Sequence, residues 1–401
     1  MEHERGTNPG QGEPVASGPL AGVRVVEMVG LGAAPFTAMM LADMGAEVIR
    51  VDRPGGSEVM SQVPARFDVL ARGRRSVALN LKKPGAVQAV LELVRHADIL
   101  LEGFRPGVME RLGLGPDACF AANPRLVYGR MTGWGQDGPL AQAAGHDINY
   151  IALAGALHTV GPKDGPPVPP MNMVGDFGGG GMLLAFGVMC ALHEARQSGR
   201  GQVVDAAMTE GATLLAAMNW GFKAAGLWRN ERGSNVNDGG SHYYGAYECA
   251  DGKCVSIASA EPQFYALLRE KLDLTDPAFD AQHDPRRWPE LKERLATIFR
   301  TKTRAEWCAL LEGTDVCFAP VLDWDEAPEH PHNRARGMFI DLEGVKQPAP
   351  APRFSRTPPQ MPHAPAAAGA DTEAVLAAWG FGAARIGELR ESGAIATQPA
   401  A

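Results

Sequence analysis

A histidine and an aspartate stand side by side in the segment GHDINYIALAG, residues 145–155, immediately before an apolar run. This pair has two interpretations. In the first, Asp147 caps the helix that follows, a position that aspartate favours, and His146 is an ordinary surface or core residue. In the second, His146 is a proton-transfer group in a substrate cleft, because histidine titrates near neutral pH.

A second titratable group, Asp176, precedes four consecutive glycines in NMVGDFGGGGMLLAF. Glycine is costly in backbone entropy, so such a run suggests that something must approach the backbone closely. We expect a helix to begin after the glycines, with free N–H groups that hold an oxyanion such as a thioester enolate. The alternative is a helix-capping aspartate beside flexible glycines. We favour the functional interpretation, because dense glycine clusters are unusual inside regular folds.

Glu261, in the segment SAEPQFY, is a third candidate. It ends a predicted strand and opens a helix at Pro262, where a glutamate is also favoured by the helix dipole alone. The segment EHPHN brings His330 and His332 near Glu329, but no second cluster with metal-ligand spacing accompanies it. We therefore predict no metal site. The six cysteines contain no C-x-x-C pair and are expected to be reduced thiols.

These candidates must be positioned by a framework in which strands and helices alternate. Residues 23–54 predict a strand, a glycine turn, a helix and a second strand, which is a βαβ unit. Further strands are predicted at 98–104, 125–135 and 201–208, with helices at 83–97, 106–115 and 181–199. Such alternation indicates an α/β fold with a mostly parallel sheet covered on both faces.

The character of the sequence changes after residue 228. We predict a large Rossmann-like domain at 19–227, a polar, glycine-rich linker at 228–242 and a smaller α+β domain at 243–335. Residues 1–18 have no apolar core, so they are predicted to be a disordered lead rather than a secretory signal. No stretch approaches the roughly 20 apolar residues that a membrane span needs. The expected location is the cytoplasm, with no membrane partner.

The charge of the chain limits the classes of ligand that it is expected to bind. The net charge of −8 argues against a nucleic-acid binder, which needs a strongly basic face. Arginines nevertheless gather near predicted strand ends in the N-terminal half, where open α/β sheets bind ligands. Such a group fits a phosphate-bearing ligand such as a nucleotide or coenzyme A, and a solvated surface is about as good an explanation. The residues concerned are Arg50, Arg53, Arg72, Arg74, Arg75, Arg105 and Arg111.

One motif is misleading. GLGAAP, residues 30–35, resembles the start of a nicotinamide-binding fingerprint, and Asp52 follows at a suitable spacing. The third glycine of that fingerprint is missing, and Pro35 stands in the first turn of the helix. An ordinary βαβ turn is the better interpretation.

Six motifs resemble the family III CoA-transferase superfamily: LLEGFRPGVMERLGLGP, RMTGWGQDGPL, GHDINY, NMVGDFGGGG, GQVVDAAMTEG and EPQFY. The resemblance extends from about residue 19 to 385. It implies an interlocked homodimer whose large Rossmann-like domain uses both ends of the chain. Residues 336–385 would then return to the large domain, and 386–401 would be a disordered tail.

The resemblance also implies roles for individual residues. It places the catalytic groups at His146, Asp176 and Glu261. The reaction implied is a 1,1-proton transfer beside a thioester carbonyl, which interconverts (2R)- and (2S)-2-methylacyl-CoA without a metal or other cofactor. The acyl-CoA substrate would be bound by Arg53, Arg72, Leu79, Gly103, Phe104, Arg105, Arg111, Gly145, Asp147, Ile148, Asn149 and Tyr150.

Two other functions remain open at this point. In the transferase branch of the superfamily, the aspartate that matches Asp176 is a nucleophile that forms a mixed anhydride with the acyl group. The histidine of GHD is characteristic of the racemase branch, so we favour a racemase. A protein that binds CoA thioesters without catalysis is a third hypothesis, and the full set of titratable residues argues against it.

Overall fold

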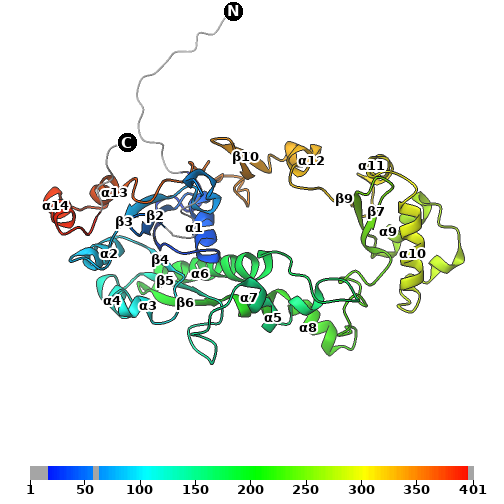
Figure 1. Cartoon of the computed structure of the whole chain (residues 1–401), viewed down its shortest axis with the longest axis horizontal. Helices are drawn as coiled ribbons and strands as arrows, with labels where there is room; N and C mark the ends of the chain where they lie inside the picture. Colours follow the sequence, from blue (N-terminus) through cyan, green and yellow to red (C-terminus); the bar gives the residue numbers. More distant parts are fainter. Residues whose placement is uncertain (1–16, 57–62, 396–401) are drawn as a thin grey trace, which may run out of the picture. The chain divides into compact units, whose positions relative to one another are not determined.

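The computed structural model describes residues 17–56 and 63–395. The chain folds into two compact units (Figure 1). Of the described residues, those up to 147, 173–211 and those from 340 to 395 form the first unit, and residues 148–172 and 212–339 form the second. The two units are described separately below.

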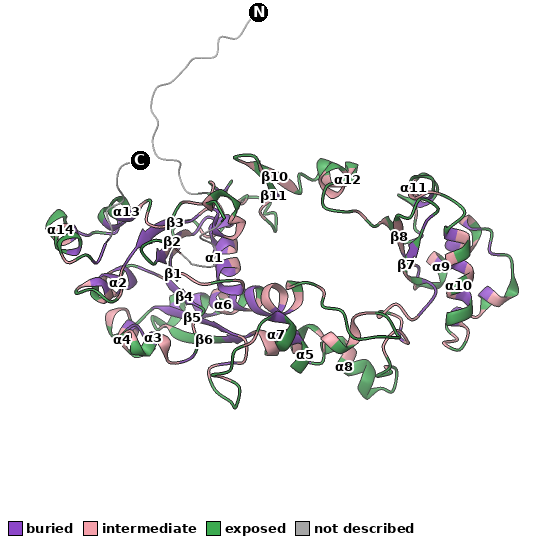
Figure 2. Cartoon of the chain, viewed as in Figure 1, coloured by how far each residue is buried: buried purple, intermediate pink, exposed green. Residues whose placement is uncertain are grey.

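A six-stranded parallel sheet forms the centre of the first unit, as the alternation of elements predicted. The strand order is β3-β2-β1-β4-β5-β6. The inner strands consist almost entirely of buried residues, as expected for a sheet covered on both faces (Figure 2). The strands are β1 (Arg24–Met28), β2 (Glu47–Asp52), β3 (Arg75–Ala78), β4 (Ile99–Glu102), β5 (Val127–Thr132) and β6 (Gln202–Ala207).

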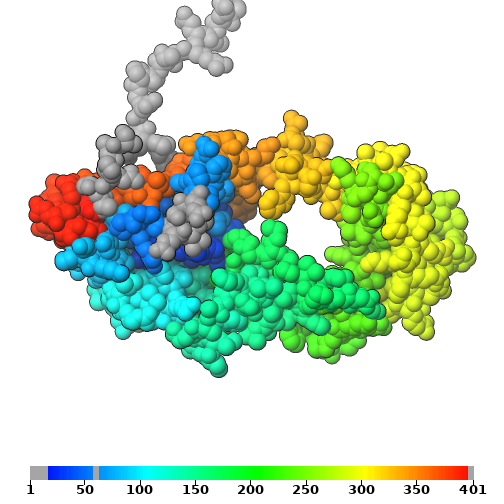
Figure 3. Space-filling model, in the orientation of Figure 1, coloured from blue at the N-terminus to red at the C-terminus, as the bar shows by residue number. Residues whose placement is uncertain are grey.

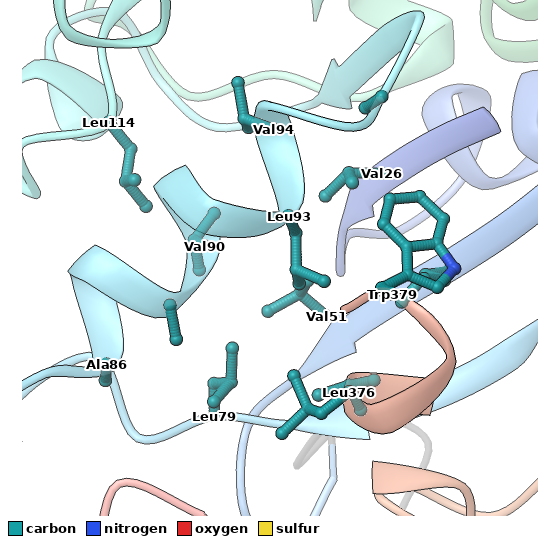
Figure 4. Packing of buried hydrophobic residues seen from close by; sticks show 14 of the residues in the cluster. Val26, Val51, Leu79, Ala86, Val90, Leu93, Val94, Leu114, Leu376 and Trp379 are labelled. Carbon is teal, nitrogen blue, oxygen red and sulfur yellow. The ribbon is translucent and has the colours of Figure 1, made fainter. Parts of the chain in front are cut away.

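Helices cover both faces of this sheet. One face packs against α1 (Ala33–Asp43) and α6 (Leu183–Ser198). The other packs against α2 (Ala86–Val94), with α13 (Thr372–Ala378) and α14 (Ala383–Glu391) from the far end of the chain. Figure 4 shows Leu376 and Trp379 of this late segment among side chains of the early strands and α2. The short helices α3 (Val108–Arg111) and α4 (Pro116–Ala122) follow β4.

The C-terminal segment is more ordered than predicted. A disordered tail was expected from residue 386, but α14 continues to Glu391, and Ile395 forms a β-bridge with Leu79. The side chains of Leu389 and Ile395 are buried, so hydrophobic burial offsets the entropy of ordering. Figure 3 shows this segment against the N-terminal part of the first unit. Residues 1–16 and 396–401, also predicted to be disordered, lie outside the described residues.

The second unit is built on a small antiparallel sheet, β7 (Tyr244–Glu248), β8 (Cys254–Ala258) and β9 (Phe318–Pro320). Buried aromatic side chains, including Tyr243, Trp288 and Phe299, join it to its helices. The unit contains α8 (Ala217–Ala224), α9 (Pro262–Lys271), α10 (Trp288–Phe299), α11 (Arg304–Leu311) and α12 (Pro331–Ala335). Helices α5 (Asp147–Leu153) and α7 (Met208–Leu215) and the hairpin β10 (Phe339–Leu342)–β11 (Val345–Pro348) lie at the boundaries between the units.

The domain boundaries need correction. The predicted large domain, 19–227, includes residues 148–172 and 212–227, which belong to the second unit. Helix α8 lies in the part of 19–227 that belongs to the second unit, and none of its residues is buried. The first unit also begins its return segment at 340 rather than 336.

One long helix passes a length and composition test for a membrane span. Within the described residues, the continuous helix 173–198 is the only such candidate, which differs from the expectation of none. It begins earlier than the sequence suggested, because the glycine run is helical. It packs against α1, β5 and β6, and one such helix is weak evidence for a membrane span, because helices of soluble proteins pass the same test.

Candidate active site

The carboxylate of Asp176 lies over the turn that follows β1. Gly32, in that turn, has a φ of 71°, and a methyl group built on it would be 3.4 Å from Asp176 Oδ2. Ligands of open parallel sheets bind outside the carboxyl ends of the strands, and β1 ends at Met28, just before this turn. Asp176 therefore has the position expected of a functional group in this fold. The partial glycine motif at 30–35 is the turn beside which this carboxylate lies.

A hydrogen bond links the segment of His146 to the segment of Asp176. The backbone N–H of Asp176 donates to Asp147 Oδ2 over 2.7 Å. Asp147 is 6% exposed, whereas His146, the residue before it, is exposed. The first unit thus brings two of the three predicted catalytic residues into one neighbourhood. The carboxylate of Asp147 thus accepts from the start of a different helix, and its other oxygen has no partner in the helix that follows it in sequence.

The glycine run is not placed as predicted. We expected Gly178–Gly181 to precede a helix and expose free N–H groups, but residues Met173–Met182 form a π-helix, η4, that continues directly into α6. The glycines are inside the helix and allow close packing. A methyl group on Gly181 would be 2.6 Å from Phe36 of α1, and one on Gly180 would be 2.9 Å from Met208. Asp176, in the first turn of η4, is the group near the helix start.

The closest of these approaches joins η4 to α7. A methyl group on Gly211 would lie 1.8 Å from the carbonyl oxygen of Gly179. We expect Gly211→Ala to lower the free energy of unfolding by about 3 kcal/mol, the upper range for overpacking, and to reduce activity because η4 carries Asp176. Chemical denaturation measures the first effect. The matched control is Gly387→Ala in α14, where a methyl group meets nothing within 4 Å; equal stability of the two variants would contradict the close contact.

Glu261 belongs to the second unit. It occupies the N-cap position of α9 with an extended backbone, and Pro262 begins the helix, as the sequence predicted. Its side chain is exposed and makes no capping hydrogen bond within the described part of the chain. A favourable interaction with the helix dipole needs no capping hydrogen bond, so this role and the catalytic role of Glu261 both stay predictions.

Two residues predicted to bind the substrate are buried in the first unit. Arg72 is 2% exposed and bonds to Asp43, with N–O distances of 2.7 and 3.2 Å, and to Gln347. Leu79 lies in the hydrophobic core. Neither side chain is available to a ligand, so both predictions are corrected. No local pattern indicates this burial, since Asp43 and Gln347 are distant from Arg72 along the chain.

Burial and ion pairing also reduce the number of arginines in the N-terminal group that a ligand can contact. Arg50 pairs with Asp52 at 2.7 Å, Arg74 with the fully buried Glu27, and Arg75 with Glu47. The remaining three, Arg53, Arg105 and Arg111, are exposed and have no ion pair within the residues that the structure describes. These three are the arginines able to meet an anionic ligand.

A buried ion-pair network holds the loop that carries Arg105. Glu102, at the end of β4, accepts from the Phe104 N–H at 2.7 Å and from Arg130 Nε at 2.8 Å. Arg130 also bonds to Glu110 of α3 at 2.8 Å, so both ends of the loop are tied to one guanidinium group. Burial raises the pKa of Glu102, against the lowering effects of the Phe104 N–H and Arg130.

We expect Glu102→Gln to destabilise the protein and to weaken substrate binding. Removing one charge of a buried pair costs about 3 kcal/mol, and a looser loop should raise KM while kcat changes little. Denaturation and steady-state kinetics measure both. Glu373→Gln is the control, because Glu373 pairs with Arg390 on the surface and such pairs contribute at most about 1 kcal/mol. An unchanged KM in Glu102→Gln would contradict a role for the network in substrate binding.

A cavity of about 300 Å³ lies at the carboxyl ends of β1 and β2. Its lining includes Leu31 and Gly32 of the turn beside Asp176, together with the charged pairs Glu27–Arg74 and Arg50–Asp52. Sequence reasoning did not single out Glu27. Its position inside an apolar strand was the available signal, since a buried charge needs a partner.

The remaining predicted substrate residues fall in two places. Gly103 is exposed and Phe104 half-buried in the β4–α3 loop, and Gly145 is half-buried just before His146. Ile148, Asn149 and Tyr150 open the part of the chain that belongs to the second unit; the first two are exposed, and Tyr150 is buried.

Comparison with known proteins agrees with this fold. The model of CoA-transferase family III matches residues 20–372. The chain belongs to this family. It is 45% identical over 373 residues to the alpha-methylacyl-CoA racemase of Mus musculus and 43% identical over 375 residues to that of Homo sapiens. Each alignment covers 92% of this chain and 96% of the relative.

A solved structure supports the same assignment. The crystal structure of a CAIB/BAIF family protein from Brucella suis is similar to this chain, with a TM-score of 0.80 and 26% sequence identity. The match covers 90% of this chain and 100% of the Brucella suis chain. Membership of CoA-transferase family III agrees with the interpretation of residues 30–35 as an ordinary βαβ turn.

Proposed function

We propose that this protein is an isomerase that interconverts (2R)- and (2S)-2-methylacyl-CoA thioesters. The observation that carries the proposal is the hydrogen bond that joins the segments of His146 and Asp176. It occurs in a chain 43% and 45% identical to two proteins named alpha-methylacyl-CoA racemase. Inversion at carbon needs one proton-transfer group on each face of that carbon, and these two residues provide them.

The proposed reaction moves one proton off the α-carbon and returns another from the opposite side. His146, assisted by Glu261, acts on one face, and Asp176 acts on the other. The C–H electron pair moves into the thioester as a planar enolate, and reprotonation restores the C–H bond with inverted configuration. No atom is gained or lost and no oxidation state changes, so this chemistry needs no redox cofactor.

The CoA part of the substrate would be bound mainly through exposed groups. Arg53, Arg105 and Arg111 suit its phosphates, because a guanidinium group pairs with phosphate oxygens. The cavity beside Gly32 gives the substrate access to the neighbourhood of Asp176. Gly103, Phe104, Gly145, Ile148, Asn149 and Tyr150 stay as predicted contacts.

A CoA transferase is the competing function, since the family includes that activity by name. In that reaction Asp176 would attack the thioester and form an acyl anhydride. The decisive assay uses (2S)-2-methylacyl-CoA without any acceptor acid, followed by chiral analysis. A racemase produces the (2R) epimer under these conditions. Hydroxylamine trapping at Asp176, together with a requirement for an acceptor, would instead establish the transferase.

The family resemblance suggests a homodimer, and exposed apolar side chains support it. Large apolar residues of α6 to α8 and just beyond are more than half exposed, although water contact with such groups is unfavourable. We propose that a second copy covers them in a cytoplasmic homodimer with no nucleic-acid or membrane partner; sedimentation velocity tests the oligomeric state. The residues are Phe186, Leu214, Leu215, Met218, Trp220 and Leu227.

A further inference from the structure

The side chain of Asp147 is nearly fully buried, yet it is only partly satisfied. Its Oδ2 accepts from the Asp176 N–H at 2.7 Å, and its Oδ1 has no hydrogen-bond partner among the described residues. Burying a carboxylate is costly unless hydrogen bonds compensate. The hydrogen bond to the Asp176 N–H is therefore the best explanation for a carboxylate at this buried position.

We propose that Asp147 is a positioning residue that fixes the backbone of Asp176 relative to His146, and so sets the separation of the two proton-transfer groups. This inference rests on the proposed racemase function. It gives Asp147 a different role from the substrate contact that the family resemblance suggested, because its carboxylate is turned to the backbone of Asp176 and shielded from solvent.

The path of the chain shows why such a link is needed. Residues 148–172, which connect His146 to the segment of Asp176, belong to the second unit. The covalent connection between the two catalytic residues thus leaves the unit that holds both of them. The bond from Asp147 is a direct link within the first unit, and His146 is the neighbouring residue, with Cα atoms about 3.8 Å apart.

The amide that Asp147 engages is well suited to this role. Asp176 is in the first turn of η4, where backbone N–H groups have no partner within the helix. A carboxylate that accepts there makes a charge-assisted bond and interacts favourably with the positive end of the helix. Because the bond is made to the backbone of Asp176, it orients the residue without using its carboxylate, which lies near Gly32.

If Asp147 positions Asp176, loss of their hydrogen bond should change the stereochemical outcome of the reaction. A displacement of about 1 Å can cost about 100-fold in rate, and here Asp176 is the group displaced. His146 would still remove the α-proton from the epimer that it serves, but the enolate would be reprotonated from the same face. Deuterium exchange would then occur with retention for that epimer, while the epimer served by Asp176 would exchange slowly.

The test compares Asp147→Ala and Asp147→Asn with wild type in deuterium oxide, starting from each pure epimer. The measured quantity is the ratio of α-deuterium incorporation to inversion. The fraction of folded enzyme cancels in this ratio. Asp147→Ala should lose about 100-fold in inversion and show a ratio well above that of wild type for one epimer only. Asp147→Asn should stay close to wild type, because its carbonyl accepts the same N–H and its NH2 replaces the unbonded Oδ1.

Asp137→Ala is the matched control, since Asp137 is exposed in the same connection between β5 and α5. An unchanged ratio in Asp147→Ala, or an Asp147→Asn variant as defective as alanine, would overturn the positioning role. Amide hydrogen exchange of the peptide that contains Asp176 tests the bond without catalysis. Protection of this peptide from exchange should fall in Asp147→Ala and stay at the wild-type level in Asp147→Asn and Asp137→Ala. If wild type itself did not epimerise, the proposed function would fail, and this second measurement would still decide whether Asp147 holds Asp176.

Discussion

Replacing His146 by alanine should lower the rate of epimerisation by about 10²- to 10⁴-fold, the usual contribution of a general acid or base. His146 is exposed beside the buried Asp147, so its removal creates no cavity and should leave the fold intact. Binding of the CoA thioester should also persist, because the predicted phosphate contacts are on other loops. Chiral analysis of the product and calorimetric binding of a non-reactive CoA thioether measure the two effects.

The control for this variant is His96→Ala, an exposed histidine of the first unit that follows α2. It should match wild type in both measurements. Full epimerase activity in the His146 variant would remove the residue from the mechanism. Loss of binding together with activity would show instead that His146 holds the substrate.

The variant Asp176→Asn should lose inversion to a similar extent, about 10²- to 10⁴-fold. Asparagine keeps the shape of the side chain and the backbone N–H that donates to Asp147, so the change is confined to the proton-transfer group beside Gly32. Exchange of the α-proton should survive for the epimer served by His146, now with retention of configuration. Deuterium incorporation and inversion, measured separately for each epimer, reveal this asymmetry.

Asp117→Asn, an exposed aspartate in the first turn of α4, is the matched control. Its exchange and inversion should be those of wild type. Complete loss of exchange from both epimers in Asp176→Asn would contradict independent action of His146. It would favour a step that depends wholly on Asp176, such as anhydride formation.

Much of the fold could be predicted because its signals are local. Apolar strands that alternate with helices predicted the parallel sheet, and strands β1, β2, β4, β5 and β6 lie where expected. Strand β3 was missed because Arg75 opens it and the preceding arginines suggested a loop. Its residues are buried through pairing with β2 and packing against α13, which are long-range effects that no local pattern reveals.

The glycine run illustrates a different limit. The density of glycines correctly indicated a close approach to the backbone, but not what approaches. A ligand was expected, whereas the close neighbours of Gly180 and Gly181 are side chains of α1 and α7. Glycine permits both a ligand and a neighbouring helix to come near, so only the tertiary structure distinguishes them.

The charged residues show the same dependence on long-range contacts. Arg72 and Arg105 look alike in sequence, yet one is buried against Asp43 and the other is exposed. His146 and Asp176 were predicted as site residues because GHDINY and NMVGDFGGGG resemble motifs of the family, and the structure joins their two segments by a hydrogen bond. The bond that joins their segments could not be predicted, since Asp147 had an obvious local role as a helix cap.

Incubation of the wild-type protein with a single epimer of a 2-methylacyl-CoA in deuterium oxide tests the central claim most directly. Mass spectrometry counts α-deuterium, and chiral chromatography separates the epimers. The two-base mechanism predicts that every inverted molecule carries deuterium. It also predicts that each pure epimer, used as the starting material, is converted into the same mixture of both epimers. Inverted product without deuterium, or no exchange at the α-carbon from either epimer, would contradict proton transfer by His146 and Asp176.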